Sequence, residues 1–129
     1  MERITGEMPK APTLDGSRIL IVDNEQAVAN LLELAVREAG AEIVGPADNA
    51  GDALRLIEHE QIDAALVTMI LSGAYCDGIA AELERQHIPF AITTGIGVDA
   101  THPELKSVPI ITKPFQALYV QQVLAQMLR

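Results

Sequence analysis

Tryptophan is absent from this chain and basic residues are scarce, and both deficits narrow what the protein can do. Nine Lys and Arg stand against 18 Asp and Glu, so the formal net charge is -9. Because nucleic-acid backbones and anionic lipid surfaces attract clustered Lys and Arg, we expect neither nucleic acid nor a membrane as a partner. With 3% aromatic residues, the core must consist of Ala, Leu, Ile and Val, which suits helices packed on a parallel sheet.

Cysteine and long apolar runs are also lacking. The single cysteine, Cys76, cannot form an internal disulfide, which is typical of a reducing compartment. No apolar run approaches the roughly 18 residues of a membrane span, and residues 1–16 contain no apolar segment typical of a secretory signal. We therefore expect a cytoplasmic protein with a loosely ordered tail over 1–16 and one domain over 17–129.

Short apolar runs alternate with helical patterns along the rest of the chain. The runs that predict strands are 18–22, 42–44, 62–68, 88–93 and 108–111. Apolar residues at helical spacing predict helices between and after them, with Asn24 and Asn49 as caps for the first two. The stretch 98–107 predicts only a short or irregular helix. This alternation indicates an α/β fold, a flavodoxin-like doubly wound five-stranded parallel sheet of order 2-1-3-4-5 with helices on both faces.

The residues at the carboxyl ends of the strands are the candidates for a functional site. In an open parallel sheet, ligands bind beyond these ends, beside the point where the strand order reverses. Asp23 and Asn24 follow the first predicted strand, and Thr68 ends the third. Thr94 and Lys113 follow the fourth and fifth. The sequence therefore predicts that these five side chains meet in one pocket.

The segments around these residues resemble the receiver domain of response regulators in two-component signalling. The resemblance covers roughly residues 17–129, and its matching pieces are 19–23, 45–47, 63–71, 94–95 and 113–115. The stretch 90–95 further resembles the subclass named after its Phe-Ala-Thr-Gly-Tyr motif, although Ile96 stands where the tyrosine is expected. The resemblance implies phosphoryl transfer from a kinase histidine to an aspartate on the third strand.

Several residues match the parts that the family uses. The resemblance assigns the lysine that contacts the phosphoryl group to Lys113, before a cis peptide at Pro114. It assigns the hydroxyl on the fourth strand to Thr94. Of the two acids that hold Mg²⁺ in the family, the first is Asp23.

Three other positions depart from the family. Asn24 stands at the second acid, Thr68 at the phosphoacceptor aspartate, and Ile110 at the aromatic residue that moves on activation. A threonine hydroxyl is neutral at pH 7 and needs a base before it can attack phosphorus. Mg²⁺ prefers several hard oxygen ligands, and Asp23 is the single carboxylate left at the expected positions, so we expect weak metal binding. Glu25 could contribute only if its loop rotates.

The first hypothesis is a stand-alone pseudo-receiver, not an enzyme and without a cofactor, that acts by protein–protein interaction. Its expected partners are a histidine kinase or another two-component signalling protein, with a homodimer as a further option. Family members commonly bind partners through the face that corresponds to residues 98–129, where Tyr119 is a candidate anchor.

Two alternatives remain open. One is an atypical response regulator that is phosphorylated on Thr68, Asp63 or Asp77. The other is a sensor that binds a small ligand in the vestigial pocket formed by Asp23, Asn24, Thr68, Thr94 and Lys113.

Overall fold

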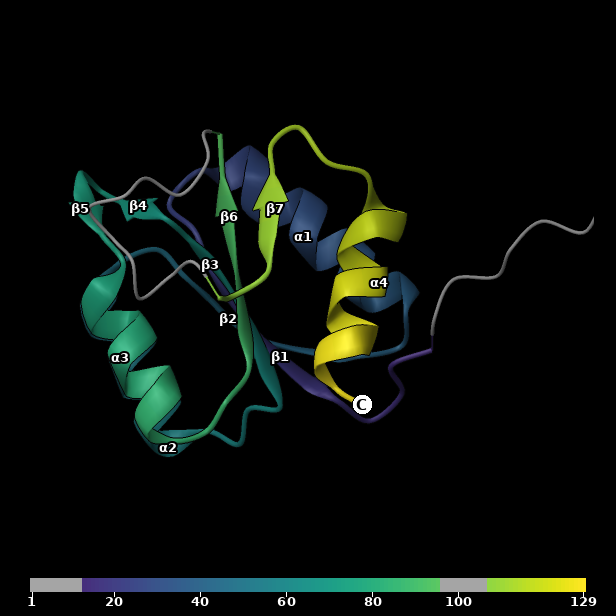
Figure 1. The fold of residues 1–129 in the computed structure, drawn as a ribbon, viewed down its shortest axis with the longest axis horizontal. Helices are drawn as coiled ribbons and strands as arrows, with labels where there is room; N and C mark the ends of the chain where they lie inside the picture. The colour runs from purple at the N-terminus through teal and green to yellow at the C-terminus, as the bar shows by residue number, and fades with distance from the viewer. Residues whose placement is uncertain (1–12, 96–106) are drawn as a thin grey trace, which may run out of the picture.

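Five parallel strands form a sheet through the middle of the molecule (Figure 1). The computed structural model describes residues 13–95 and 107–129. In chain order, the strands of this sheet are β1 (Arg18–Val22), β2 (Glu42–Ala47), β3 (Ala64–Thr68), β6 (Phe90–Thr94) and β7 (Ile110–Thr112). Their order across the sheet is β2-β1-β3-β6-β7, and every neighbouring pair is parallel. The flavodoxin-like order predicted from the sequence is therefore confirmed, with β3 at the centre.

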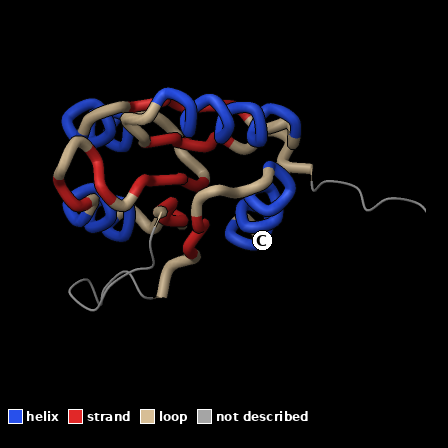
Figure 2. The backbone as a smooth tube through the Cα atoms, turned by 90° about the horizontal axis from the view of Figure 1, so that it is seen from above, coloured by secondary structure: helices blue, strands red, loops and turns tan. Residues whose placement is uncertain are grey.

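Helices cover both faces of the sheet, as the view from above shows (Figure 2). Helices α1 (Gln26–Glu38) and α4 (Ala117–Met127) pack together on one face. Helices α2 (Ala50–His59) and α3 (Asp77–Arg85) pack together on the other. None of these helices combines the length and the apolar character that crossing a bilayer requires.

The apolar runs form strands that are buried from both sides. Successive side chains of a strand point to opposite faces. Accordingly Ile19 and Ile21 of β1 belong to the core under α1 and α4, whereas Leu20 and Val22 belong to the core under α2 and α3. All five residues of β3 are buried. Both cores are built almost wholly from aliphatic side chains, as the scarcity of aromatic residues predicted.

The stretch after β3, expected to be a loop, contains a short hairpin. Its strands are β4 (Ile70–Leu71) and β5 (Ala74–Tyr75), which pair antiparallel. Ser72 and Gly73 connect them with positive φ angles of 53° and 86°. Two adjacent residues with positive φ are what the tightest hairpin turns need. Strands of two residues are too short for a periodic pattern, so the sequence could not reveal them.

The first two helices begin differently from each other. The Asn49 side chain accepts a hydrogen bond from the Asp52 N–H and caps α2, which confirms that prediction. The predicted cap at Asn24 is wrong. Glu25 occupies the N-cap position of α1, Asn24 is exposed, and the Asp23 Oδ1 atom accepts the Glu25 N–H at 2.8 Å. The Glu25 side chain makes no capping hydrogen bond, so α1 begins without a side-chain cap.

Leu14, within the segment expected to be a tail, packs against the domain. It is 5% exposed, and its N–H donates to the Ala39 carbonyl at 2.7 Å. Residues 1–12 of the expected tail lie outside the described residues. The predicted short helix over 98–107 also lies outside them, except for Ser107.

Strand β2 runs further than predicted because it continues through Gly45-Pro46. The peptide between these residues is cis, and Gly45 has a φ of +92°. A Cβ at Gly45 would lie 2.8 Å from the Ala47 N atom. Glycine is therefore the residue type that fits at position 45. Beyond it, the strand continues to Ala47, which pairs with Val22.

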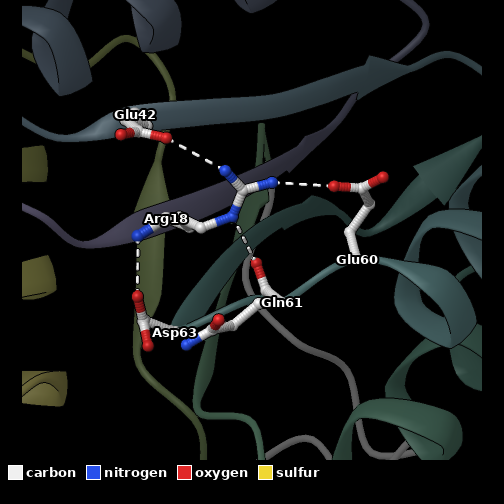
Figure 3. A network of polar contacts seen from close by, with 5 residues as sticks. All are labelled: Arg18, Glu42, Glu60, Gln61 and Asp63. Carbon is white, nitrogen blue, oxygen red and sulfur yellow. Dashed lines mark hydrogen bonds and ion pairs between the residues drawn. The ribbon is translucent and has the colours of Figure 1, made fainter.

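Arg18 joins the strands at the amino end of the sheet (Figure 3). Its guanidinium contacts Glu42 Oε1 at 2.9 Å, Glu60 Oε1 at 2.7 Å and the Gln61 carbonyl at 2.8 Å. Its backbone N–H donates to Asp63 Oδ2 at 2.8 Å. One side chain thus connects β1 with β2 and with the segment that leads into β3.

Candidate functional site

A pocket of about 280 Å³ opens at the carboxyl ends of β3 and β6, at the opposite end of the sheet from Arg18. Three of the residues predicted from the sequence line it: Thr68, Thr94 and Lys113. Asp23 joins them through Lys113, whereas Asn24 is exposed and is not part of the lining. Among the described residues, the lining consists of Glu25, Thr68, Met69, Ile70, Thr93, Thr94, Gly95 and Lys113.

The Lys113 ammonium lies between two carboxylates of the loop that follows β1. Its Nζ atom is 3.0 Å from Glu25 Oε1 and 3.8 Å from Asp23 Oδ2. The Asp23 side chain is fully buried, the Lys113 side chain is 20% exposed, and Glu25 is mostly exposed at the rim. Asp23 and Lys113 therefore form an ion pair, and Glu25 forms a closer one with the same ammonium.

The Asp23 carboxylate is held in an unfavourable environment. Burial raises its pKa above the usual 3.8, against the opposing effects of the Glu25 N–H and the Lys113 charge. Its Oδ2 atom is buried and has no hydrogen-bond partner. Among the described residues, Lys113 is the only cation within ion-pair distance of this carboxylate.

Glu25 is a pocket residue that sequence reasoning set aside. The Asp23 side chain accepts the N–H of the residue two positions later, which is the geometry of an Asx turn. This turn brings the Glu25 carboxylate to Lys113 without any rotation of the loop. The sequence signal that could have indicated this contact is an aspartate, Asp23, two residues before Glu25 at the start of a predicted helix.

Thr93 is the second pocket residue that the sequence did not indicate. It is the register partner of Thr68 across β3 and β6, so both side chains point to the same face of the sheet. Thr93 is 0% exposed, and its Oγ1 atom has no hydrogen-bond partner. Thr94, the predicted hydroxyl, is 5% exposed, and its carbonyl accepts the Lys113 N–H at 2.8 Å.

The remaining predicted residues lie around or away from the pocket. The Lys113–Pro114 peptide is cis, as expected. Ile110 is half-buried against the core under α2 and α3. Tyr119 is 47% exposed, and its hydroxyl donates a long hydrogen bond of 3.5 Å to the Ile110 carbonyl. Asp63 is bound to Arg18 at the far end of the sheet.

The donor groups of the pocket do not fit a tight Mg²⁺ site. Within the described ranges, no three His, Cys, Asp or Glu side chains are grouped so that they could hold a metal. Asp23 Oδ2 is unpartnered, but the Glu25 carboxylate is engaged by Lys113, whose charge also repels a cation. Mg²⁺ needs near-octahedral coordination by hard oxygens. Weak metal binding therefore stays a prediction.

Comparison with known proteins relates the chain as a whole to several solved structures. No protein-family model and no curated protein matches the sequence. Among solved structures, the chain is 32% identical to SdrG from Sphingomonas melonis Fr1, with a TM-score of 0.77. That match covers 88% of this chain and 97% of SdrG.

Two further structures name the kind of domain. The signal receiver domain of a modulated diguanylate cyclase from Desulfovibrio desulfuricans G20 is 26% identical with a TM-score of 0.77, over 86% of this chain and 92% of that one. The response regulator PhyR from Brucella abortus is 27% identical with a TM-score of 0.77, over 91% of this chain. The match covers 49% of PhyR, so the chain spans about half the length of that protein.

Proposed function

Because this chain belongs to the response-regulator receiver domains, we propose that it is a pseudo-receiver, which signals by binding another protein and takes no phosphoryl group. The observation that supports this proposal is the surroundings of Lys113. Its charge is already matched by Glu25 and Asp23, and Thr68 stands at the position of the phosphoacceptor. We propose that the chain catalyses no reaction and needs no cofactor.

The chemistry of the pocket supports the same proposal. An acyl phosphate forms when a carboxylate attacks a phosphorus atom. Thr68 offers a hydroxyl, which must lose a proton, and none of the described residues that line the pocket is a histidine. Of the two carboxylates beside Lys113, Asp23 is fully buried, and Glu25 is held by the Lys113 ammonium at 3.0 Å. None of these groups is a ready nucleophile for a phosphodonor.

The rival function is a phosphorylated response regulator with an unusual acceptor. Asp63 does not favour it, because its Oδ2 atom accepts the Arg18 N–H at the amino end of the sheet. Asp77 begins α3 and is not part of the pocket lining. Thr68 itself lines the pocket, but the lining within residues 13–95 and 107–129 offers it no histidine as a base.

Intact mass after incubation with acetyl phosphate and Mg²⁺ separates these two functions. A pseudo-receiver keeps its mass, whereas the variant Asn24→Asp/Thr68→Asp, under the same conditions, gains one phosphoryl group and serves as the positive control. A hydroxylamine-sensitive adduct on the unmodified chain contradicts the proposal. A hydroxylamine-resistant adduct also contradicts it and identifies a hydroxyl such as Thr68.

Partner binding is proposed to be constitutive and to involve Tyr119. A ligand shifts a conformational equilibrium only through its different affinity for the two states, and no acceptor is available to supply that difference. Tyr119 is half exposed beside a hollow of about 340 Å³ that Phe115 and Thr112 also line. Half-buried tyrosines of this kind are frequent anchors in interfaces. The proposed partners are a histidine kinase or another two-component signalling protein.

Titration of a partner recovered from the source organism, with and without acetyl phosphate and Mg²⁺, tests this part. We expect the same affinity in both conditions and a weaker affinity for Tyr119→Ala. Tyr75→Ala is the matched control, because Tyr75 is 45% exposed on β5. A tenfold change in partner affinity on adding phosphodonor, about 1.4 kcal/mol, would show that the chain is a phosphorylation-dependent switch. If Tyr119→Ala binds the partner as tightly as the unmodified chain does, only the proposed binding surface around Tyr119 is wrong.

A second candidate function, small-ligand sensing, is favoured by one specific observation. The Thr93 hydroxyl is buried, unpartnered and at a pocket of about 280 Å³, so a small polar ligand could satisfy it. Thermal shift against a panel of small polar metabolites is the test. A stabilisation that disappears in Thr93→Val supports a sensor, and the absence of any stabilising compound removes this candidate.

A further inference from the structure

The Glu25 carboxylate is directed at the pocket and not at the backbone of the helix that it begins. Glu25 occupies the N-cap position of α1, yet its side chain makes no capping hydrogen bond. Its Oε1 atom lies instead 3.0 Å from Lys113 Nζ. The Glu25 side chain is 62% exposed, whereas the Lys113 side chain is 20% exposed. The carboxylate therefore covers the ammonium from the solvent side of the pocket.

The two carboxylates beside Lys113 contact its ammonium differently. The Glu25 contact has the length of an ordinary hydrogen bond, whereas Asp23 Oδ2, at 3.8 Å, is too far away for one. Asp23 is fully buried and Glu25 is exposed, so an anion that enters from solvent approaches Glu25 first. Such an anion can replace the hydrogen bond of the ammonium only by displacing the Glu25 carboxylate.

The local charge opposes an anion as well. At neutral pH, the carboxylates of Asp23 and Glu25 outnumber the single ammonium of Lys113. This group of three side chains therefore repels a phosphate or sulfate ion, although it contains a lysine. The formal net charge of -9 on the whole chain adds to the repulsion. A neutral molecule does not meet this penalty.

We propose that Glu25 determines the ligand specificity of this pocket, because its carboxylate occupies the Lys113 ammonium and thereby excludes anions of the phosphate class. The inference deepens the proposed function and rests on it, since it concerns the same pocket in a chain that holds no phosphoryl group. An exposed ion pair is weak in water. Glu25 therefore acts by lowering the affinity for anions and does not block the pocket completely.

Titration of inorganic phosphate at constant ionic strength tests this role. The backbone amide shifts of Thr94, Gly95 and Lys113, measured by NMR spectroscopy, report binding at the pocket. We expect Glu25→Gln to bind phosphate about five- to tenfold more tightly than the unmodified chain, because it removes a full charge beside the ammonium. Glu25→Ala, which also removes the carboxylate, should show at least the same gain.

Glu42→Gln is the matched control. The Glu42 side chain is 65% exposed, and its Oε1 atom lies 2.9 Å from Arg18 Nη1 at the amino end of the sheet. This variant changes the net charge as Glu25→Gln does, but it should leave the phosphate affinity of the pocket unchanged. In Glu25→Gln/Lys113→Gln the gain should disappear, because the ammonium that binds the anion is removed as well.

Equal phosphate affinity in the unmodified chain and in both Glu25 variants would overturn the proposal. So would an equal gain in Glu42→Gln, because net charge alone would then account for the effect. A gain that persists without the Lys113 ammonium would also overturn it. If the Lys113 variant does not fold, the comparison of Glu25→Gln with Glu42→Gln decides by itself.

Failure of this inference is distinguishable from failure of the proposed function. Inorganic phosphate is not a phosphodonor, so an unchanged phosphate affinity contradicts the role of Glu25 alone. A phosphoryl adduct on the unmodified chain after incubation with acetyl phosphate contradicts the pseudo-receiver, whatever the phosphate affinities are.

Discussion

Glu25 Oε1 lies 3.0 Å from Lys113 Nζ, although 88 residues separate the two in the sequence. The pair connects the loop after β1 with the end of β7 across the mouth of the pocket. Because Glu25 is mostly exposed, this contact contributes little to stability by itself. Its importance is positional, since it holds the Lys113 ammonium beside the buried Asp23 carboxylate.

Removing the Lys113 ammonium should leave the buried Asp23 carboxylate without a counter-ion. We expect Lys113→Met to lower the free energy of unfolding by about 1–3 kcal/mol at pH 7, because the Asp23 charge loses its counter-ion. Adding Asp23→Asn should recover most of the loss. Urea unfolding of the two single variants and the double variant measures the coupling. Strictly additive effects would show that the two groups do not interact.

Asp23→Asn alone should stabilise the protein at neutral pH, by about 1 kcal/mol. The folded-state pKa of Asp23 is raised above 3.8, so the unfolded chain releases this proton at lower pH than the folded one. The stability linked to Asp23 is thus fully present below the unfolded pKa and is lost as the pH rises through the folded pKa. The advantage of Asp23→Asn should accordingly shrink toward pH 4 and below. A difference that is constant from acid to neutral pH contradicts this account.

Thr93→Val should also stabilise the protein, by roughly 1 kcal/mol, because it replaces an unpartnered buried hydroxyl with a methyl group of similar size. Chemical denaturation measures the change. Thr112→Val serves as the control, since Thr112 is exposed on the neighbouring β7 and should change little. Destabilisation by Thr93→Val would mean that the hydroxyl has a partner, such as a bound ligand or water.

Restoring the acceptor should not by itself restore a switch. In Thr68→Asp, the new carboxylate would still face a pocket with Asn24 in place of an acid and Ile110 in place of an aromatic residue. We expect Asn24→Asp/Thr68→Asp to be phosphorylated better than the single variant, with little change in partner affinity. Phosphorylation by intact mass and affinity by titration give the two readouts. Full switching in Thr68→Asp alone would refute this expectation.

Magnesium binding should be millimolar or weaker, roughly less than 4 kcal/mol. One buried carboxylate and a lysine at 3.8 Å are a poor donor set for a divalent cation. Isothermal calorimetry with MgCl₂ measures it, with Asp23→Asn as the control that removes the remaining ligand. Micromolar binding that depends on Asp23 would contradict the prediction.

The parallel sheet was predictable from the sequence because continuous apolar runs alternate with helical patterns, which is typical of a doubly wound fold. Burial on the helices depends on neighbours far away in the chain, which apolar spacing alone does not describe. Leu31 fits the helical spacing of the apolar residues on α1, yet it is 54% exposed. Gln121 is polar, yet it is buried, and its Nε2 atom donates to the Ala35 carbonyl of α1.

The pocket was predictable in outline but not in its details. The strand ends and the family resemblance predicted the positions of Thr68, Thr94 and Lys113. Thr93 requires the register of β6 against β3, which no local pattern contains. Glu25 requires the backbone turn that Asp23 makes with its own side chain, which a residue-by-residue match to the family does not describe.

The ties of Arg18 have a consequence for how this chain could change over generations. They secure β1, β2 and the approach to β3 at one end of the sheet, by contacts with Glu42, Glu60, Gln61 and Asp63. The pocket residues stand at the other end, about five residues or roughly 16 Å along each strand. Substitutions at Asn24 or Thr68 therefore touch none of these ties. A lineage could lose its reaction there, one position at a time, while the shape that partners recognise was inherited intact.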